Sequence, residues 1–479
     1  MLFNSLEFLA FLPIVFLLYW SLRHSVRWQN LLIVVASYVF YGWWDWRFLM
    51  LIALTSSCSY ASGLLLEKYE GKREMQKVVS ATNIVLNLTI LAIFKYYNFF
   101  VENLDAIFSS VFGYHFGWIT LDIILPVGIS FYTFQALSYT IDVYQKKLPA
   151  THDIIEFFAY ISFFPQLVAG PIERATNLLP QFQKARLFDY AKATDGLRQM
   201  LWGFFKKLVI ADNCATIVNE YWNQYQDLAG HTLFLLGVMF TFQIYCDFSG
   251  YSDIAIGCAR LFGFNLMRNF DFPYFSRSIP EFWRRWHISL TTWFRDYIYF
   301  PLGGSRCVKW EIIRNIFIVW CISGLWHGAN WTFVCWGLFH ATLLAIYNLL
   351  GINTKCKDCV AHGHYFPNIK EIFQMALTFF LTIIGWIIFR AENMPQAWDY
   401  LYCMFTNAPT GGDTFYLWTF YCFMFLAIEW LQRDKQHALQ FPDTKLFQSR
   451  IVRWSVYYLI LMIIIFSTGT NQTFIYFQF

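Results

Sequence analysis

Charged side chains are scarce in this sequence. Only 14% of its 479 residues are Asp, Glu, Lys or Arg, whereas an ordinary soluble chain has about 25%. Hydrophobic residues make up 57%, so the composition excludes an ordinary soluble enzyme and indicates a membrane protein. The net charge of +4 is small for this length. No polybasic tract marks a site for nucleic acid or lipid headgroups.

A disulfide framework is also missing. The eleven cysteines are mostly scattered singly within apolar runs, where a cysteine behaves as a small hydrophobe. The exception is "KCKDCVAHGH", which places Cys356, Cys359, His362 and His364 in one loop. These residue types are zinc ligands, but the usual finger spacing is absent. A metal site and an ordinary polar loop both stay open there, and we predict no metal at the functional site.

Several catalytic signatures do not occur in the chain. We find no zincin motif, no Walker loop and no nucleophile elbow. The first apolar run, residues 8–22, has neither a basic leader nor a small-residue cleavage site. We therefore expect it to be a retained helix and not a removed signal peptide.

Apolar runs recur along the whole chain. They cover residues 8–22, 31–44, 48–66, 84–101, 119–139, 233–245, 316–326, 331–350, 372–389, 416–427 and 457–466. A helix needs about 20 mostly apolar residues to cross the hydrocarbon, so the runs predict roughly ten to twelve spans, some of them short or broken. Nothing suggests a separate soluble domain, and we predict a single membrane-embedded domain over residues 1–479.

Basic residues predict the orientation of the chain. Arg23 and Arg27 follow the first run, and four more basic residues lie between Lys68 and Lys77, after the third. Because basic short loops stay in the cytoplasm, the N-terminus is expected outside it.

Proline and glycine interrupt the pattern after residue 125. "FFPQLVAGPIER" would break a helix at Pro165, Gly170 and Pro171. Irregular backbone at membrane depth is tolerated only against protein or a water-filled cavity. The stretch therefore predicts a re-entrant segment.

The stretch "SIPEFWRRWHISLTTWFRDYIYFPLGG" predicts one amphipathic helix. Ser278 and Glu281 have the spacing of a capping box. Arg284, His287, Thr291 and Arg295 then follow one face at helical spacing, opposite a face of aromatic residues. We expect this helix to lie along an interface or to form the floor of a cavity, with His287 facing polar surroundings.

Two histidines occur in "SGLWHGANWTFVCWGLFHA". His327 ends an apolar run, and the small residues Gly328 and Ala329 after it allow a break and a close helix approach. His327 is either a neutral histidine hydrogen-bonded between helices or a general base for a hydroxyl group. For His340, thirteen residues further on, we predict packing.

These motifs together resemble a known family. "WHGANWTFVCWGLFHA", "FFPQLVAGPIER", "CDFSGYSDIAIGCARLFGF", "FWRRWHISLTTWFRDYIYFPLGG" and "NQTFIYFQF" are similar to the membrane-bound O-acyltransferases, in particular to the bacterial alginate and peptidoglycan O-acetyltransferase branch. The resemblance covers essentially the whole chain. It implies an all-α polytopic fold in which about eleven transmembrane helices form a ring, with re-entrant and interfacial helices around a central tunnel.

The resemblance also implies roles for individual residues. His327 occupies the place of the family's catalytic histidine, and His287 that of a second, supporting one. An acetyl group would pass from cytoplasmic acetyl-coenzyme A, with no tightly bound cofactor, to a hydroxyl outside the membrane. His287 would orient His327, donate to the developing oxyanion or hold the donor. Asn330 is a candidate for the same donor role or for a helix cap.

Five basic residues are candidates for binding the donor. Arg284, Arg285, Arg295, Lys206 and Lys207 would attract the phosphates of coenzyme A or of a carrier protein, but each is equally explained as a side chain that reaches toward the membrane interface.

Rival functions stay open at this point. The first is a transporter of a lipid-linked sugar or acyl carrier, although transporters tend to contain internal repeats and we find no convincing one. The second is a D-alanyl transferase for teichoic acids that uses a carrier-protein thioester. The acceptor, a polysaccharide or a relay protein, and the expected extracytoplasmic hydrolase-like acetyltransferase partner follow from the resemblance alone. So does a bacterial inner-membrane location.

Overall fold

The computed structural model describes residues 1–113, 120–121, 123–168, 170–352, 358–408, 416–441, 444–467 and 472–475. All regular secondary structure in these ranges is helical, which confirms the predicted all-α class. The described chain forms two compact units, residues 1–193 with 258–266 and residues 194–257 with 267–479. The prediction of a single domain over residues 1–479 stays a prediction.

The first unit contains the N-terminal helices. They are α1 (Leu6–Ser21), α2 (Val26–Asp45), η1 (Trp46–Phe48), α3 (Leu49–Lys68), α4 (Arg73–Phe112), α5 (Ile129–Tyr144), α6 (Ile154–Ser162), α7 (Phe164–Leu167), α8 (Ala175–Gln183) and the start of α9 (Tyr190–Phe205). Buried amides join them: Asn83 of α4 donates to Ser59 Oγ of α3 at 3.3 Å and to Thr140 Oγ1 of α5 at 2.7 Å. Such bonds satisfy polar groups where water is absent.

The predicted break near Pro165 is present in this unit. Helix α6 ends at Ser162, and α7 lasts for only four buried residues, with Pro165 in its first turn. A proline is tolerated in a first turn because its missing N–H would have no partner there. The interrupted helix agrees with the irregular segment that the sequence predicts.

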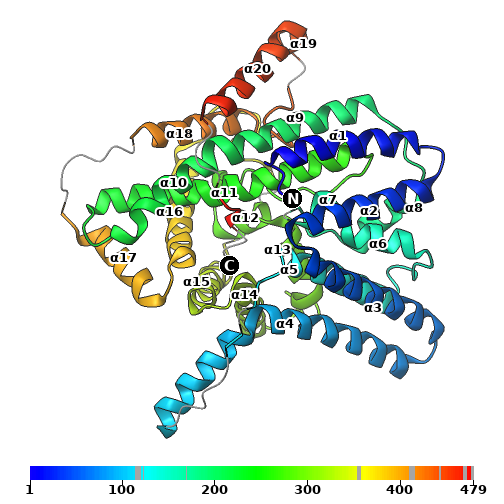
Figure 1. Cartoon of the computed structure of the whole chain (residues 1–479). Helices are drawn as coiled ribbons and strands as arrows, with labels where there is room; N and C mark the ends of the chain where they lie inside the picture. Colours follow the sequence, from blue (N-terminus) through cyan, green and yellow to red (C-terminus); the bar gives the residue numbers. More distant parts are fainter. Residues whose placement is uncertain are drawn as a thin grey trace. The chain divides into compact units, whose positions relative to one another are not determined.

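The second unit contains the candidate site. Its helices are the rest of α9, η2 (Lys206–Ala211), α10 (Asp212–Tyr221), η3 (Trp222–Gln224), α11 (Gly230–Leu261), η4 (Pro273–Phe275), α12 (Ile279–Arg285), α13 (Ile288–Phe294), η5 (Arg295–Tyr299), α14 (Lys309–His327), α15 (Trp331–Leu349), α16 (Ile369–Arg390), α17 (Met394–Thr406), α18 (Tyr416–Leu431), α19 (Lys445–Gln448) and α20 (Arg450–Ser467). Helices α14 and α15 lie side by side as a hairpin (Figure 1).

Six segments of the described chain are long and apolar enough to cross a membrane. They are Val26–Lys68, Arg73–Phe112, Gly230–Leu261, Trp331–Leu349, Ile369–Arg390 and Arg450–Ser467. Three shorter apolar helices accompany them, Leu6–Ser21, Ile154–Leu167 and Trp418–Leu431. The polytopic membrane class is confirmed, whereas the count of about eleven helices and their arrangement as a ring around a tunnel stay predictions.

Candidate active site

His327 lies at the turn of the α14–α15 hairpin. It is the last residue of α14, and Gly328 continues in extended conformation, with φ −168° and ψ 159°. A Cβ atom on Gly328 would collide with the ring of Phe333, so a larger residue at this turn would have to displace that ring. Helix α15 then begins at Trp331. The predicted break after His327 is confirmed.

Two more glycines bring these helices close together. A Cβ on Gly324 would meet the carbonyl oxygen of Phe333, and one on Gly337 would meet that of Trp320. Small residues let helix backbones approach in this way inside membranes. The helices of the hairpin therefore approach closely next to the histidine, through two glycines other than the residues from which the sequence predicts a close approach.

Aromatic rings surround the His327 imidazole. Its centroid lies 5.0 Å from Trp326, 4.9 Å from Trp336 and 5.3 Å from Phe389, and each of the three rings is close to perpendicular to it. The residue is buried, with 6% of its surface exposed. This packing limits the rotamers open to the ring and holds it in one place.

The predicted amphipathic helix is broken at His287. Helix α12 ends at Arg285, Trp286 is extended, and His287 adopts the left-handed conformation, with φ 44° and ψ 53°, before α13 begins. The prediction of one continuous helix is therefore wrong. A non-glycine residue in this conformation costs of order 1–3 kcal/mol and persists only where its surroundings enforce it.

His287 is buried, and its contacts are more apolar than the sequence predicts. The ring lies 4.6 Å from Phe248, measured between centroids, and Nδ1 lies 3.1 Å from Asn269 Oδ1. Burial lowers the pKa of His287 to about 3, because the apolar surroundings disfavour the charged ring. His287 is therefore neutral at physiological pH.

One cavity of about 240 Å³ brings the two histidines together. His287 and His327 both line it. Most of the wall is aromatic or aliphatic, with Trp283, Trp286, Trp320 and Leu344 among its members. Arg284, Thr291 and Arg295 complete the polar side. The four residues that the sequence places on one polar face thus share one cavity, even though the helix between them is broken.

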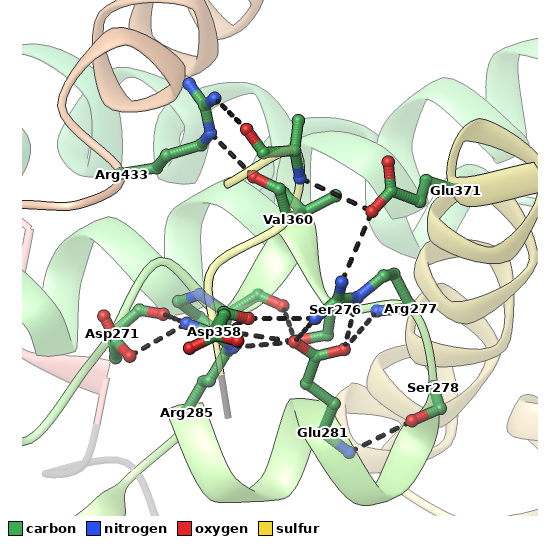
Figure 2. Close-up of polar contacts among 12 residues, drawn as sticks. Asp271, Ser276, Arg277, Ser278, Glu281, Arg285, Asp358, Val360, Glu371 and Arg433 are labelled. Atoms are coloured by element: carbon green, nitrogen blue, oxygen red, sulfur yellow. Dashed lines mark hydrogen bonds and ion pairs between the residues drawn. The ribbon is translucent and has the colours of Figure 1, made fainter. Parts of the chain in front are cut away.

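A network of arginines and carboxylates anchors α12 (Figure 2). Ser278 caps the helix by accepting from the Glu281 N–H, as predicted, but the Glu281 carboxylate accepts from the backbone N–H of Arg277 and not from that of Ser278. Glu281 also pairs with Arg277 at 3.0 Å and with Arg285 at 3.1 Å. Buried charges are stable only when paired like this, so the network holds the helix that leads into His287.

The network extends to a loop outside α12. Arg277 and Arg285 both donate to the carbonyl oxygen of Asp358, at 2.9 and 3.2 Å. Arg433 donates to the carbonyls of Val360 and Ala361 (Figure 2). The sequence analysis missed this role of the loop, because backbone carbonyls leave no signal in the sequence.

Three of the five predicted donor-binding residues are tied into buried ion pairs. Arg285 contacts Asp271 at 2.8 Å as well as Glu281. Lys206 pairs with Asp253. Lys207 lies 2.8 Å from both Asp212 and Asp247, with 1% of its side chain exposed. Their assignment as donor ligands stays a prediction, but in this structure they neutralise internal carboxylates.

Asn330 has the geometry of a helix cap. It is the N-cap of α15, where its Oδ1 accepts from the Thr332 N–H at 3.0 Å. Its Nδ2 donates to the carbonyl of Glu392 at 2.7 Å. Both ends of the amide are thus engaged in holding the hairpin, which favours the second of the two roles considered for it.

His340 packs inside the helix bundle, as predicted. Its Nδ1 accepts from Trp283 Nε1 at 3.3 Å, and the ring lies 5.1 Å from Trp336 between centroids. A Cβ on Gly385 would press on its Nε2. His340 is not among the residues that line the cavity.

Asn269 and Ser289 are site residues that the sequence analysis missed. Asn269 lies in the loop between α11 and η4, is fully buried, and contacts both His287 and Ser289. No helical periodicity runs through this loop, so its sequence contains no signal for the contact.

The cysteine–histidine loop contains three candidate ligands within the described residues, Cys359, His362 and His364, whereas Cys356 lies outside them. Among the residues that are described, no group of three or more His, Cys, Asp or Glu side chains is arranged to hold a metal ion. Whether the loop binds metal stays open.

Comparisons with known proteins agree with the motifs. The sequence model of the membrane-bound O-acyltransferase family, MBOAT, matches residues 38–389. The chain is 42% identical to the probable alginate O-acetylase AlgI of Pseudomonas aeruginosa, over 85% of this chain and 75% of that protein. It is 33% identical to the peptidoglycan O-acetyltransferase of Helicobacter pylori, over 83% of this chain and 78% of that protein.

A weaker match is to a third kind of transferase. The chain is 29% identical over 277 residues to the teichoic acid D-alanyltransferase of Bacillus subtilis, which covers 56% of this chain and 69% of that protein. The family match contains the cavity with both histidines. From the matched range and from the relatives, the chain belongs to the membrane-bound O-acyltransferase family and is an acyltransferase.

Proposed function

We propose that this protein moves an acetyl group from cytoplasmic acetyl-coenzyme A to a hydroxyl outside a bacterial inner membrane. The hydroxyl belongs to a polysaccharide or to a relay protein such as a hydrolase-like acetyltransferase partner. The observation that carries the proposal is the shared cavity of His287 and His327. The names of the relatives that cover most of the chain, an alginate O-acetylase and a peptidoglycan O-acetyltransferase, support acetyl as the group transferred.

In the proposed reaction, His327 is the general base. Its imidazole takes the proton of the acceptor hydroxyl as the oxygen attacks the thioester carbonyl. The tetrahedral intermediate then expels the thiolate of coenzyme A, the C–S bond breaks, and the proton returns from His327 to the sulfur. The products are the O-acetyl ester and free coenzyme A, so protons and electrons balance without another reactant.

The cavity suits a small acyl group. Its volume of about 240 Å³ is below the range of roughly 300–1,000 Å³ for pockets that enclose drug-sized ligands. Arg284 and Arg295 lie on its wall and are the two predicted donor ligands that fit a role in attracting the phosphates. His287, on the same wall, would orient the reacting groups.

D-alanyl transfer is the second candidate, and the comparisons favour it less. The D-alanyltransferase match covers 56% of the chain, compared with 83–85% for the two acetyltransferases. The transporter alternative loses its support because the chain belongs to a family of acyltransferases.

The first test uses purified protein in vesicles with labelled acetyl-coenzyme A on the cytoplasmic face. We expect His327→Ala to lower transfer by about 10²- to 10⁴-fold, the usual contribution of a general base. His24→Ala, which changes an exposed histidine in the first unit, is the matched control. Equal turnover in wild type and His327→Ala would contradict the role of His327. No turnover in either protein would contradict acetyl-coenzyme A as the donor. The assay would then be repeated with a D-alanyl carrier protein as the donor.

A further inference from the structure

Asn269 makes an unusual set of contacts with the segment that contains His287. Its backbone carbonyl accepts from the Ile288 N–H at 2.9 Å. Its side-chain Oδ1 lies 3.3 Å from the Ser289 N, 2.9 Å from Ser289 Oγ and 3.1 Å from His287 Nδ1. Its Nδ2 donates to Ser252 Oγ at 3.1 Å. Asn269 thus contacts His287 at the break and the first two residues of α13, Ile288 and Ser289.

The amide of Asn269 has only one orientation that fits these partners. A backbone N–H can donate but cannot accept, so the atom that faces the Ser289 N–H must be the oxygen. The nitrogen then faces Ser252 Oγ, which can accept. The orientation therefore follows from chemistry and does not depend on distinguishing oxygen from nitrogen by position.

This orientation determines which nitrogen of His287 carries the proton. Oδ1 is an acceptor, so Nδ1 at 3.1 Å must be protonated to bond it. Ser289 Oγ also lies 3.4 Å from Nδ1, but its single proton has the shorter contact of 2.9 Å to Oδ1. A neutral imidazole has only one N–H, so Nε2 holds the lone pair.

The surroundings of His287 favour this neutral form. The rings packed against it are Phe248 of α11, Phe270 of the preceding loop and Trp326 of α14. The charged groups that share its cavity are Arg284 and Arg295, together with the titratable His327. Among the described residues that line the cavity there is no carboxylate, and positive neighbours disfavour a protonated ring.

We propose that Asn269 is a positioning residue that fixes His287 as the Nδ1–H tautomer, so that His287 acts through Nε2 as a hydrogen-bond acceptor. The proposal rests on the proposed acyl transfer and narrows the role of His287 in it. A ring whose only N–H is bonded to Asn269 cannot donate to the oxyanion. It can accept a hydrogen bond from a hydroxyl or an imidazole N–H, which orients that group for proton transfer. The same bonds hold His287 in its left-handed conformation.

The direct test is the ¹⁵N spectrum of ring-labelled histidine in bilayers at pH 7. Protonated and unprotonated ring nitrogens give well-separated signals, and His287→Gln identifies the signals of His287 by their loss. We expect protonated Nδ1 and unprotonated Nε2 in the wild type. An Nε2–H tautomer or an imidazolium would overturn the proposal, and the other histidine signals, unchanged in His287→Gln, show that this variant folds.

Two substitutions test whether Asn269 determines the tautomer of His287 or only packs against it. Asn269→Asp keeps an acceptor oxygen and should preserve the Nδ1–H signal, whereas Asn269→Ala removes it and should shift His287 toward the Nε2–H form. If the tautomer is unchanged in Asn269→Ala, Asn269 does not set it.

Kinetics then connects the tautomer to the reaction. Asn269→Ala should lower kcat by about 10²-fold, the lower end of general acid–base contributions, with little change in KM. Asn269→Asp places a carboxylate against Nδ1, favours the charged ring, and should add a new loss of activity on the acidic side of the pH profile. Unchanged kcat with an altered tautomer would overturn the catalytic part. If acetyl-coenzyme A is not the donor, all variants are inactive with it while the ¹⁵N result still stands.

Discussion

Glu281 shows how one buried charge stabilises the site. Burial alone would raise the pKa of this carboxyl, but hydrogen bonds from Arg277 and the charge of Arg285 outweigh it and hold the pKa below its usual 4.5. A carboxyl with a lowered pKa in the folded state stabilises the protein above about pH 4.5. That contribution is lost as the pH falls through the folded-state pKa.

We therefore predict a pH-dependent cost for Glu281→Gln. At pH 7 the substitution should lower the free energy of unfolding by about 3 kcal/mol, the lower end for a broken buried ion pair, because Arg277 and Arg285 lose their shared carboxylate but keep Glu371 and Asp271. The difference from the wild type should shrink below about pH 4.5. Thermal unfolding in detergent from pH 7 to pH 3 measures this difference in the free energy of unfolding.

Asp434→Asn is the matched control for this experiment. Asp434 pairs with Lys435 at 3.0 Å, but 55% of its side chain is exposed, and exposed pairs contribute about 0–1 kcal/mol. A loss in Glu281→Gln that is no larger than in this control, or that does not depend on pH, would contradict the assigned role.

At the same scale, the sequence predicted the histidines but not their partners. His287 and His327 stood out because imidazoles are rare in apolar stretches, and the structure brings them to one cavity. Asn269 was missed because its contacts depend on the tertiary fold. Lys206 and Lys207 were predicted as candidate donor ligands, but Asp253 and Asp247, which pair with them, lie 47 and 40 residues further along the chain, and only Asp212 is close in sequence.

At the scale of elements, helices α12 and α13 show what helical periodicity predicts and what it misses. Spacing placed Arg284, His287, Thr291 and Arg295 together, and they line one cavity. The break between the helices consists of two residues, extended Trp286 and left-handed His287 with φ 44°. A hydrophobic pattern averages over several residues, so one left-handed residue leaves no trace in it.

Residues 472–475 belong to the stretch "NQTFIYFQF" that contributes to the family resemblance, and they pack near the site. Phe474 is fully buried, with its ring centroid 4.4 Å from that of Tyr251 and 6.1 Å from that of Phe248. Phe248 in turn packs on the His287 ring. Phe474 therefore packs against Phe248, and Phe248 packs against the His287 ring.

We predict that Phe474→Ala destabilises the protein and lowers its activity. The cavity left by the ring should cost about 3 kcal/mol, and transfer should fall because Phe248 loses its support. Unfolding in detergent and the vesicle assay measure the two effects. Phe466→Ala, where the ring is 78% exposed, should change stability by no more than about 0.5 kcal/mol. Equal effects of the two substitutions would contradict the packing role.

For the whole molecule, the composition predicted the structural class but not the number of membrane spans. Scarce charge and long apolar runs predicted a polytopic helical protein, and six described segments qualify as spans. Several other apolar helices are shorter, between 10 and 17 residues. Whether short helices cross depends on their neighbours and on local membrane thickness, which hydropathy does not contain.

The proposed orientation leads to a prediction about the loops. Reporter fusions at Lys72, between α3 and α4, should be fluorescent with green fluorescent protein and inactive with alkaline phosphatase, because both results indicate the cytoplasm. Fusions at Trp46, between α2 and α3, should give the opposite pair and serve as the control. Active phosphatase at Lys72 would reverse the orientation and place the N-terminus in the cytoplasm.

The buried ion pairs of Lys207 have a consequence for synthesis. Asp247 accepts from the Ile475 N–H at 2.8 Å, a bond to a residue 228 positions later in the chain. Ribosomes add about 5–20 residues per second, so roughly 10 to 50 s separate the appearance of the two partners. During that interval Asp247 lacks the hydrogen bond that it accepts from the Ile475 N–H in the folded protein. Until the later segment arrives, Lys207, which precedes Asp247 in the chain, is its charged partner.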